Sequence, residues 1–173
     1  SLKSVVIPDS VTSIGSYAFR GCSGLTSITI PEGVTSLGDS AFSGCSGLTS
    51  ITIPEGVTSL EEGTFSNCTS LEGITLPEGL LSIADGREYS NTYGVFQNCT
   101  SLREVIIPDS VTSIGNKAFY GCSSLTSVSI GDSITSIGSY AFQGCSSLTS
   151  ITIPEGVTSL EYQTFYNCTS LES

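Results

Sequence analysis

Apolar and polar residues alternate over a short stretch that recurs along the whole chain. Residues 25–31 read L-T-S-I-T-I-P, in which Ile28 and Ile30 are separated by hydroxyl residues. A period of two predicts a short strand with one face in the interior and the other in solvent. Pro31 then ends the strand, because proline lacks the N–H that strand pairing needs.

The remainder of each unit predicts a second short strand and a turn that complete the coil. Val34 and Leu37 bracket two hydroxyl residues, which indicates a second short extended stretch. A tight turn or a single helical turn through Ala41 and Phe42 then leads to Gly44. Gly or Asn at that position suits backbone torsions that other residues resist.

Cysteines mark the repeat most sharply, since the steps between them are 23, 23, 31, 23, 23 and 23 residues. A fixed period between 20 and 50 residues indicates a solenoid, whose units must stack to bury a core. We expect coils about 4.8 Å apart, with like side chains in columns. The two clearest columns are Cys22, Cys45, Cys68, Cys99, Cys122, Cys145, Cys168 and Phe19, Phe42, Phe65, Phe96, Phe119, Phe142, Phe165.

A longer period lies over the short one. Residues 1–73 align without a gap on residues 101–173, and 51 of the 73 positions are identical. Three 23-residue coils and one 31-residue coil make this unit of 100 residues. We therefore expect residues 1–173 to form a single solenoid of about seven coils, with an insertion near 84–94, and to be a fragment of a longer array.

The unit L-x-x-I-x-I-P-x-x-V-x-x-I-x-x-x-A-F-x-x-C-x-x resembles the leucine-rich repeats of the BspA-like family of bacterial and protist surface proteins. The columns that carry the resemblance include Leu148, Pro154, Phe165 and Cys168. The resemblance implies a mainly β leucine-rich repeat solenoid with a parallel sheet on its concave side, and with short second strands and short helical turns on the other side. It also implies an extracellular or cell-surface location and adhesion to host matrix or to other cells.

Charge and composition narrow the functional classes. The net charge is −11, with 16 acidic and five basic residues, which argues against nucleic acid and anionic membranes as partners. No stretch of 18 apolar residues predicts membrane insertion. The chain has no His, no glycine-rich phosphate loop and no pair of acid and base in distinct surroundings, so we expect no enzyme activity and no cofactor.

The eight extra residues of the long coil are the first candidate binding site. They lie within A-D-G-R-E-Y-S-N-T-Y-G, where charged and aromatic residues are combined as at recognition hot spots. A loop that is merely tolerated is an equal alternative, because long surface insertions cost little. We expect Glu61, Glu62, Asn116 and Lys117 of the adjacent coils beside its base. The candidate residues are Arg87, Glu88, Tyr89, Asn91 and Tyr93.

The solvent face of the first strand is the second candidate. Most of its positions carry Ser or Thr, but Lys3 and Val6 in one coil depart from this rule, as do Arg103, Glu104 and Ile106 in another. These departures would give a partner protein an anchor. Sequence drift on an exposed sheet explains them equally well.

Three other recurring positions are interpreted structurally. One carboxylate per coil is too few for a calcium site, which needs six to eight oxygens, so we predict a solvated acidic stripe and no metal. We expect buried free thiols, because stacked Cβ atoms lie too far apart for a disulfide and no C-x-x-C pair offers zinc spacing. Asn67, Asn98 and Asn167 each begin an N-C-T sequon, and a turn explains their recurrence better than glycosylation does.

The sequence therefore favours a non-enzymatic protein-binding module. The expected partner is a protein of the host matrix or of another cell surface. A structural spacer, or a filament that self-associates end to end, is the alternative. Ice binding through threonine arrays is a remoter one.

Overall fold

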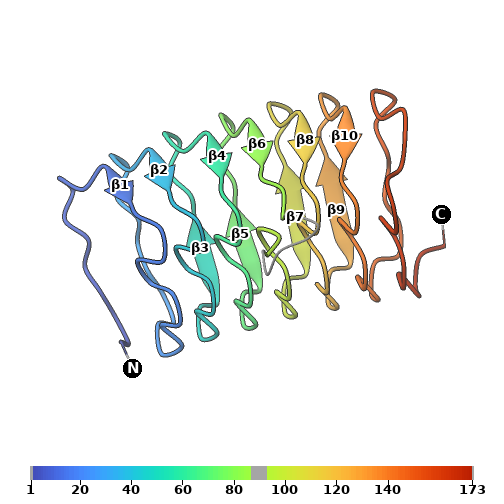
Figure 1. Ribbon diagram of the computed structural model, residues 1–173. Coiled ribbons are helices and arrows are strands. Elements are labelled where there is room, and N and C mark those ends of the chain that lie inside the picture. Colours follow the sequence, from blue (N-terminus) through green and yellow to red (C-terminus); the bar gives the residue numbers. More distant parts are fainter. Residues whose placement is uncertain (1, 87–92, 173) are drawn as a thin grey trace.

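The computed structural model describes residues 2–86 and 93–172, which wind into coils stacked along one axis from the N-terminal to the C-terminal end (Figure 1). Each strand is two to four residues long, because each coil turns again after a few residues. In chain order the strands are β1 (Ser13–Ile14), β2 (Ser36–Leu37), β3 (Ser50–Thr52), β4 (Ser59–Leu60), β5 (Gly73–Thr75), β6 (Ser82–Ile83), β7 (Glu104–Ile107), β8 (Ser113–Ile114), β9 (Ser127–Ile130) and β10 (Ser136–Ile137).

The strands form two rows on different sides of the coils, and every pairing is parallel. The second strand of each coil contributes the pair β1–β2 and the four-stranded sheet β4–β6–β8–β10. Within the described residues, the first strands pair as β3–β5 and β7–β9. Figure 1 shows these first strands in one row and the second strands in another. The parallel solenoid and the short second strands predicted from the sequence are confirmed.

The interior is built from columns of identical side chains. Neighbouring phenylalanine rings lie 5.2–5.7 Å apart between centroids and are within 13° of parallel. The five middle rings are fully buried. Leucine, isoleucine and valine columns complete the core. Stacking is thus what buries these residues, as expected for units too small to fold alone.

The connection before each phenylalanine differs from the helical turn predicted as one alternative. Among the described residues no segment forms a helix, and tight turns occupy this position. Except before Phe96, the residue two places before the phenylalanine has a positive φ, for example 52° at Ser40 and 58° at Lys117. Its N–H donates to the next coil, as Ser40 does to the Glu62 C=O at 2.8 Å. This bond between coils offsets the cost of a left-handed residue.

The second turn of each coil follows the sequence prediction. Gly21, Gly44, Gly121 and Gly144 have φ between 71° and 74°, and Asn67 takes the same left-handed region. The Asn98 Nδ2 donates to the Asn67 Oδ1 at 3.1 Å, so the sequon asparagines of adjacent coils bond to each other.

The cysteines are free thiols, and five of the seven are buried. Each described thiol from Cys45 onward donates to the phenylalanine C=O of the preceding coil, with Sγ···O distances of 3.1–3.2 Å. Burial is the main cause that raises the pKa of Cys45 to about 11 and of Cys99 to about 12. The prediction of buried free thiols is confirmed, and the structure adds a role for the S–H as a donor.

Candidate functional site

The predicted insertion loop is only partly described. Arg87, Glu88, Tyr89 and Asn91 lie outside the described residues. Tyr93 is half-buried, and its Cβ lies close to the position that a Cβ on Gly63 would take.

The base of this loop is fixed to the next coil. The Gly86 N–H donates to the Asn116 C=O at 2.9 Å, and the Asn116 N–H donates to the Asp85 Oδ1 at 2.8 Å. A Cβ on Gly94 would overlap the Lys117 carbonyl oxygen, so the chain returns to the coil at very close range. The expected positions of Asn116 and Lys117 beside the base are confirmed.

The long coil is joined to its successor on two of its sides. On the turn side, the Phe96 N–H donates to the Ala118 C=O at 2.8 Å. On the second-strand side, β6 pairs with β8. The eight extra residues therefore leave the stacking of these two sides intact.

On the third side the two coils separate. Strands β5 and β7 belong to different sheets. The Arg103 N–H approaches the Glu72 C=O at 3.4 Å, whereas the equivalent bond one coil earlier, from the Glu72 N–H to the Thr49 C=O, is 2.9 Å; nearer the C-terminal end, the Thr149 N–H approaches the Thr126 C=O at a similar 3.5 Å. The first distance lies beyond the usual range for N–H···O bonds. The sheet face therefore opens between β5 and β7.

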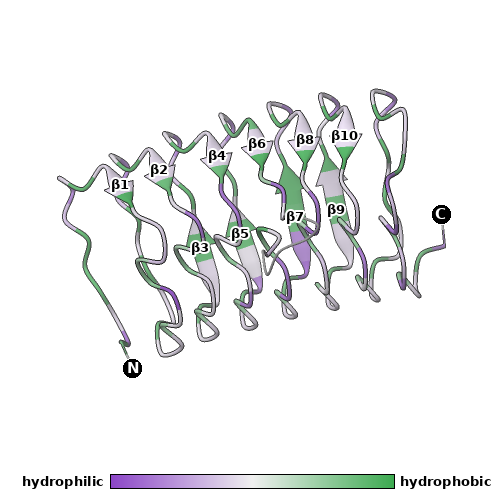
Figure 2. Cartoon of the chain, viewed as in Figure 1, coloured by the Kyte–Doolittle hydropathy of each residue, from purple (hydrophilic) through white to green (hydrophobic). Residues whose placement is uncertain are grey.

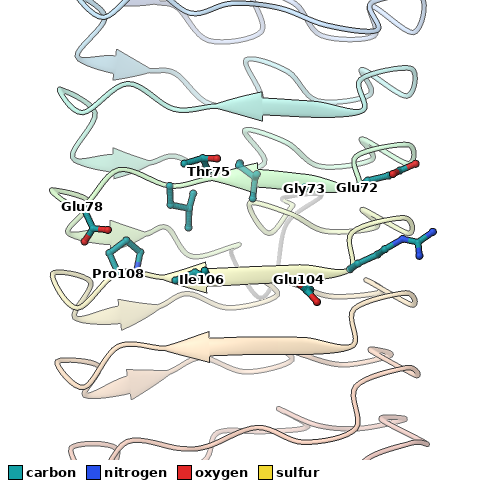
Figure 3. Close-up of a pocket in the computed structure, with 10 residues that line it drawn as sticks. Glu72, Gly73, Thr75, Glu78, Glu104, Ile106 and Pro108 are labelled. Atoms are coloured by element: carbon teal, nitrogen blue, oxygen red, sulfur yellow. The ribbon is translucent and has the colours of Figure 1, made fainter.

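A groove of about 590 Å³ occupies this opening, and we name it the β5–β7 groove. Its residues are Glu72, Gly73, Ile74, Thr75, Leu76, Glu78, Arg103, Glu104, Ile106 and Pro108. Figure 3 shows Glu72 and Glu78 at opposite ends of the groove, with Glu104 and Ile106 along the β7 side. The three strand-face residues singled out from the sequence, Arg103, Glu104 and Ile106, are thus brought together, and Tyr93 does not line the groove.

The floor of the groove is apolar, and its Ile74 is less buried than the equivalent residues of the neighbouring coils. Ile74 is half-buried, although its partner Ile51 is only 4% exposed and Val105 only 2%. Beside it, a Cβ on Gly73 would meet nothing within 4 Å. Ile106, which is 73% exposed, supplies an apolar wall. A side chain from a partner could therefore bury apolar surface here without displacing any residue.

The rim is charged, and the charges come from both strands. Glu72, Glu78 and Glu104 are exposed carboxylates, and Arg103 is an exposed cation. In Figure 2, β7 starts hydrophilic and continues hydrophobic, whereas β9 is paler along its length. An apolar floor with a charged rim is the composition of a recognition surface.

Other kinds of site receive no support from the described part of the chain. Within residues 2–86 and 93–172, no group of three or more Cys, Asp or Glu side chains is placed to hold a metal ion. The acidic column from Asp9 to Glu155 is exposed at each coil, as predicted for a solvated stripe. Over the same ranges, no helix has the length and apolarity that crossing a bilayer requires.

Comparison with protein families identifies the repeat. A model described as the BspA type leucine-rich repeat region, in six copies, matches residues 1–92 and 90–173. This chain belongs to the BspA-type leucine-rich repeat family. The resemblance noted in the Leu, Pro, Phe and Cys columns is therefore confirmed. No curated protein gives a significant match to the chain.

Two solved structures support the fold of this BspA-type repeat. The leucine-rich repeat protein of T. pallidum is 31% identical, with a TM-score of 0.87, and the match covers 98% of this chain and 78% of that one. A leucine-rich repeat protein from Eubacterium ventriosum is 28% identical, with a TM-score of 0.80, over 96% of this chain and 43% of that one. This BspA-type repeat thus spans less than half of the second protein.

Sequence reasoning missed the β5 half of the groove. Glu72 and Gly73 also depart from the Thr-Ser pair that follows Leu25, Leu48, Leu125 and Leu148. The step of 31 residues places them beside Arg103 and Glu104. That spacing is the available signal in the sequence.

Proposed function

We propose that this protein is a non-enzymatic module that binds another protein through the β5–β7 groove. The observation that carries the proposal is the combination of an open apolar floor at Gly73 and Ile74 with the exposed Ile106. Family membership supports it, because leucine-rich repeats generally mediate protein interactions.

The proposed setting is the cell surface or the extracellular space, with a role in adhesion. The family resemblance supports this location. The proposed partner is accordingly a protein of the host matrix or of another cell surface. The net charge of −11 favours a partner with a basic surface.

The test is a binding measurement on purified matrix and cell-surface proteins by surface plasmon resonance. The decisive variant combines Arg103→Thr, Glu104→Ser and Ile106→Ser, which installs the residues of the next coil. Because β7 pairs with β9 in the register Glu104↔Ser127 and Ile106↔Ser129, these residues are compatible with the fold. We expect binding to fall at least about tenfold, or 1.4 kcal/mol.

The matched control carries Thr49→Ala, Ser50→Ala and Thr52→Ala on a neighbouring strand face. It should bind like the wild type. If the groove variant binds its partner as tightly as the control does, the groove is not the binding surface.

Self-association is a second candidate function. Each coil repeats the same columns and donates backbone hydrogen bonds to the next, for example from the Phe119 N–H to the Ala141 C=O at 2.8 Å. A coil of another copy could therefore continue the ladder. Sedimentation velocity over a range of protein concentrations would reveal such assembly, and a concentration-independent monomer would exclude it.

A further inference from the structure

We propose that the β5–β7 groove takes an extended peptide segment in which a Lys or Arg stands next to an apolar residue. This proposal rests on the proposed function and specifies the chemistry of the partner at the same groove. Three features support it: the shape of the groove, its charge, and the vacant space at Gly73.

The shape favours an extended segment. The groove runs along two parallel strands, and the four steps from Glu72 to Leu76 span about 13 Å at the rise of a strand. A stretch of about four or five extended residues has this length. Alternate side chains of such a segment would point to the floor formed by Ile74 and Leu76 and to solvent. A helix, with a diameter of about 10 Å or more, would rest on the rim instead.

The charge favours a basic segment. Three carboxylates and one guanidinium line the groove, which leaves a formal charge of −2 (three negative, one positive). The Arg103 N–H faces the Glu72 C=O, so Arg103 and Glu72 occupy the same end of the groove. Figure 3 shows the Glu78 carboxylate at the other end of the groove and the Glu104 carboxylate on the side of β7 that faces away from β5. A cation of the partner is therefore favoured at the rim near these carboxylates, and an acidic segment is repelled.

The space at Gly73 gives this cation a place for its stem. Gly73 is the residue of β5 that pairs with Ser50, and the room above it is empty of protein atoms within 4 Å of a Cβ. The half-buried Ile74 lies directly beside it. Lys and Arg bury an aliphatic stem on apolar surface while the charged head stays in water. A stem over Gly73 and Ile74 would bring the head to the rim of the groove.

The experiment is selection from a random heptapeptide library displayed on phage, with the wild-type protein as bait. The Gly73→Tyr variant serves for counter-selection, because its ring fills the groove. Tyrosine is favoured in strands, and Gly73 has no positive φ, so this variant should fold. Far-ultraviolet circular dichroism and the unfolding midpoint verify that it does.

We expect the selected peptides to pair a Lys or Arg with an adjacent apolar residue. Measured by fluorescence anisotropy, their affinity should fall at least about tenfold for Gly73→Tyr and about three- to fivefold for Glu104→Gln. The Gly73→Ser control, which copies the adjacent coil, should bind within about twofold of the wild type. Higher salt should weaken binding to the wild type more than to Glu104→Gln.

The proposal is overturned if no peptide is enriched, if the enriched peptides lack basic residues, or if Gly73→Tyr binds them unchanged. These results separate it from the proposed function. A protein partner lost in the Arg103, Glu104 and Ile106 variant, with no basic peptide selected, leaves protein binding intact and removes only the peptide chemistry. The converse result is that basic peptides are selected that bind at Gly73 while the protein partner binds the Arg103, Glu104 and Ile106 variant unchanged. That result supports the peptide chemistry and removes the groove as the binding surface for the protein partner.

Discussion

Two grooves on the first-strand side occupy equivalent places between adjacent coils, yet they differ in chemistry. The β5–β7 groove has a volume of about 590 Å³ and carries three carboxylates, one guanidinium and the exposed Ile106. A groove of about 350 Å³ between β7 and β9 shares Glu104 and Ile106 with it. A third groove, which we name the hydroxyl groove, is about 310 Å³. Its residues are Ser27, Ile28, Thr29, Ile30, Glu32, Ser50, Ile51 and Thr52.

The frame beneath the two grooves is the same. Beneath the hydroxyl groove the stacked rings Phe42 and Phe65 are 5.5 Å apart, and beneath the β5–β7 groove Phe96 and Phe119 are 5.2 Å apart. What differs is a few outward positions, at which Gly73 and Ile106 replace hydroxyl residues. The repeat thus supplies a rigid scaffold, and isolated departures from its consensus supply the recognition chemistry. In such a protein, the residues that depart from the repeat consensus are the ones that indicate function.

The largest expected effect concerns the shared frame. Phe42→Ala beneath the hydroxyl groove and Phe119→Ala beneath the β5–β7 groove should each lower the free energy of unfolding by about 3–5 kcal/mol, because each removes a fully buried ring from a continuous stack. Chemical denaturation of both variants measures this. Similar losses support a common interior, whereas a large loss in only one variant would show that the two frames differ.

A smaller destabilisation is expected at high pH. Burial raises the pKa of Cys45 from 9.0 to about 11, so the folded chain holds this proton more tightly than the unfolded chain does. Its contribution to stability is full below pH 9 and is lost as the pH rises toward 11. Thermal unfolding across this range should show a falling midpoint, and the fall should be shallower in Cys45→Ala. An identical fall in both would contradict the assignment to Cys45.

Grafting should convert one groove into the other. Thr26→Glu, Ser27→Gly, Ser50→Glu and Thr52→Ile place the charged and apolar residues of the β5–β7 groove on the hydroxyl groove. Isothermal titration with a selected basic peptide should then give two binding sites per chain in place of one. A stoichiometry that stays at one would mean that the separation of the strands, rather than their side chains, makes the site.

The smallest effect is expected for stability at the groove wall. Ile106→Thr should change the free energy of unfolding by no more than about 0.5 kcal/mol, because the side chain is 73% exposed. Urea denaturation measures this. Thr52→Val on the hydroxyl groove is the matched control, and it should be equally neutral. A clear loss for Ile106→Thr would assign Ile106 to folding instead of recognition.

The sequence by itself determined the coil and most of its interior. The alternation at Ile28 and Ile30, the proline that ends each strand and the recurring phenylalanine and cysteine define inward and outward positions, because a strand has a period of two and stacked units place like residues together. The same patterns predicted the left-handed Gly and Asn at the second turn. They also located Arg103, Glu104 and Ile106 as departures from a hydroxyl face.

Only the tertiary structure decided where two coils separate. The local sequence pattern of β5 resembles that of β3, so it does not show that β5 is unpaired with β7. Pairing depends on the distance between the backbones of two coils whose equivalent residues are 31 positions apart. The positive φ at Ser40 and Lys117 was equally hidden, since neither residue favours it and it accompanies a hydrogen bond that the residue's own N–H donates to the next coil. Residue spacing sets which side chains are neighbours, and packing between coils sets how closely they approach.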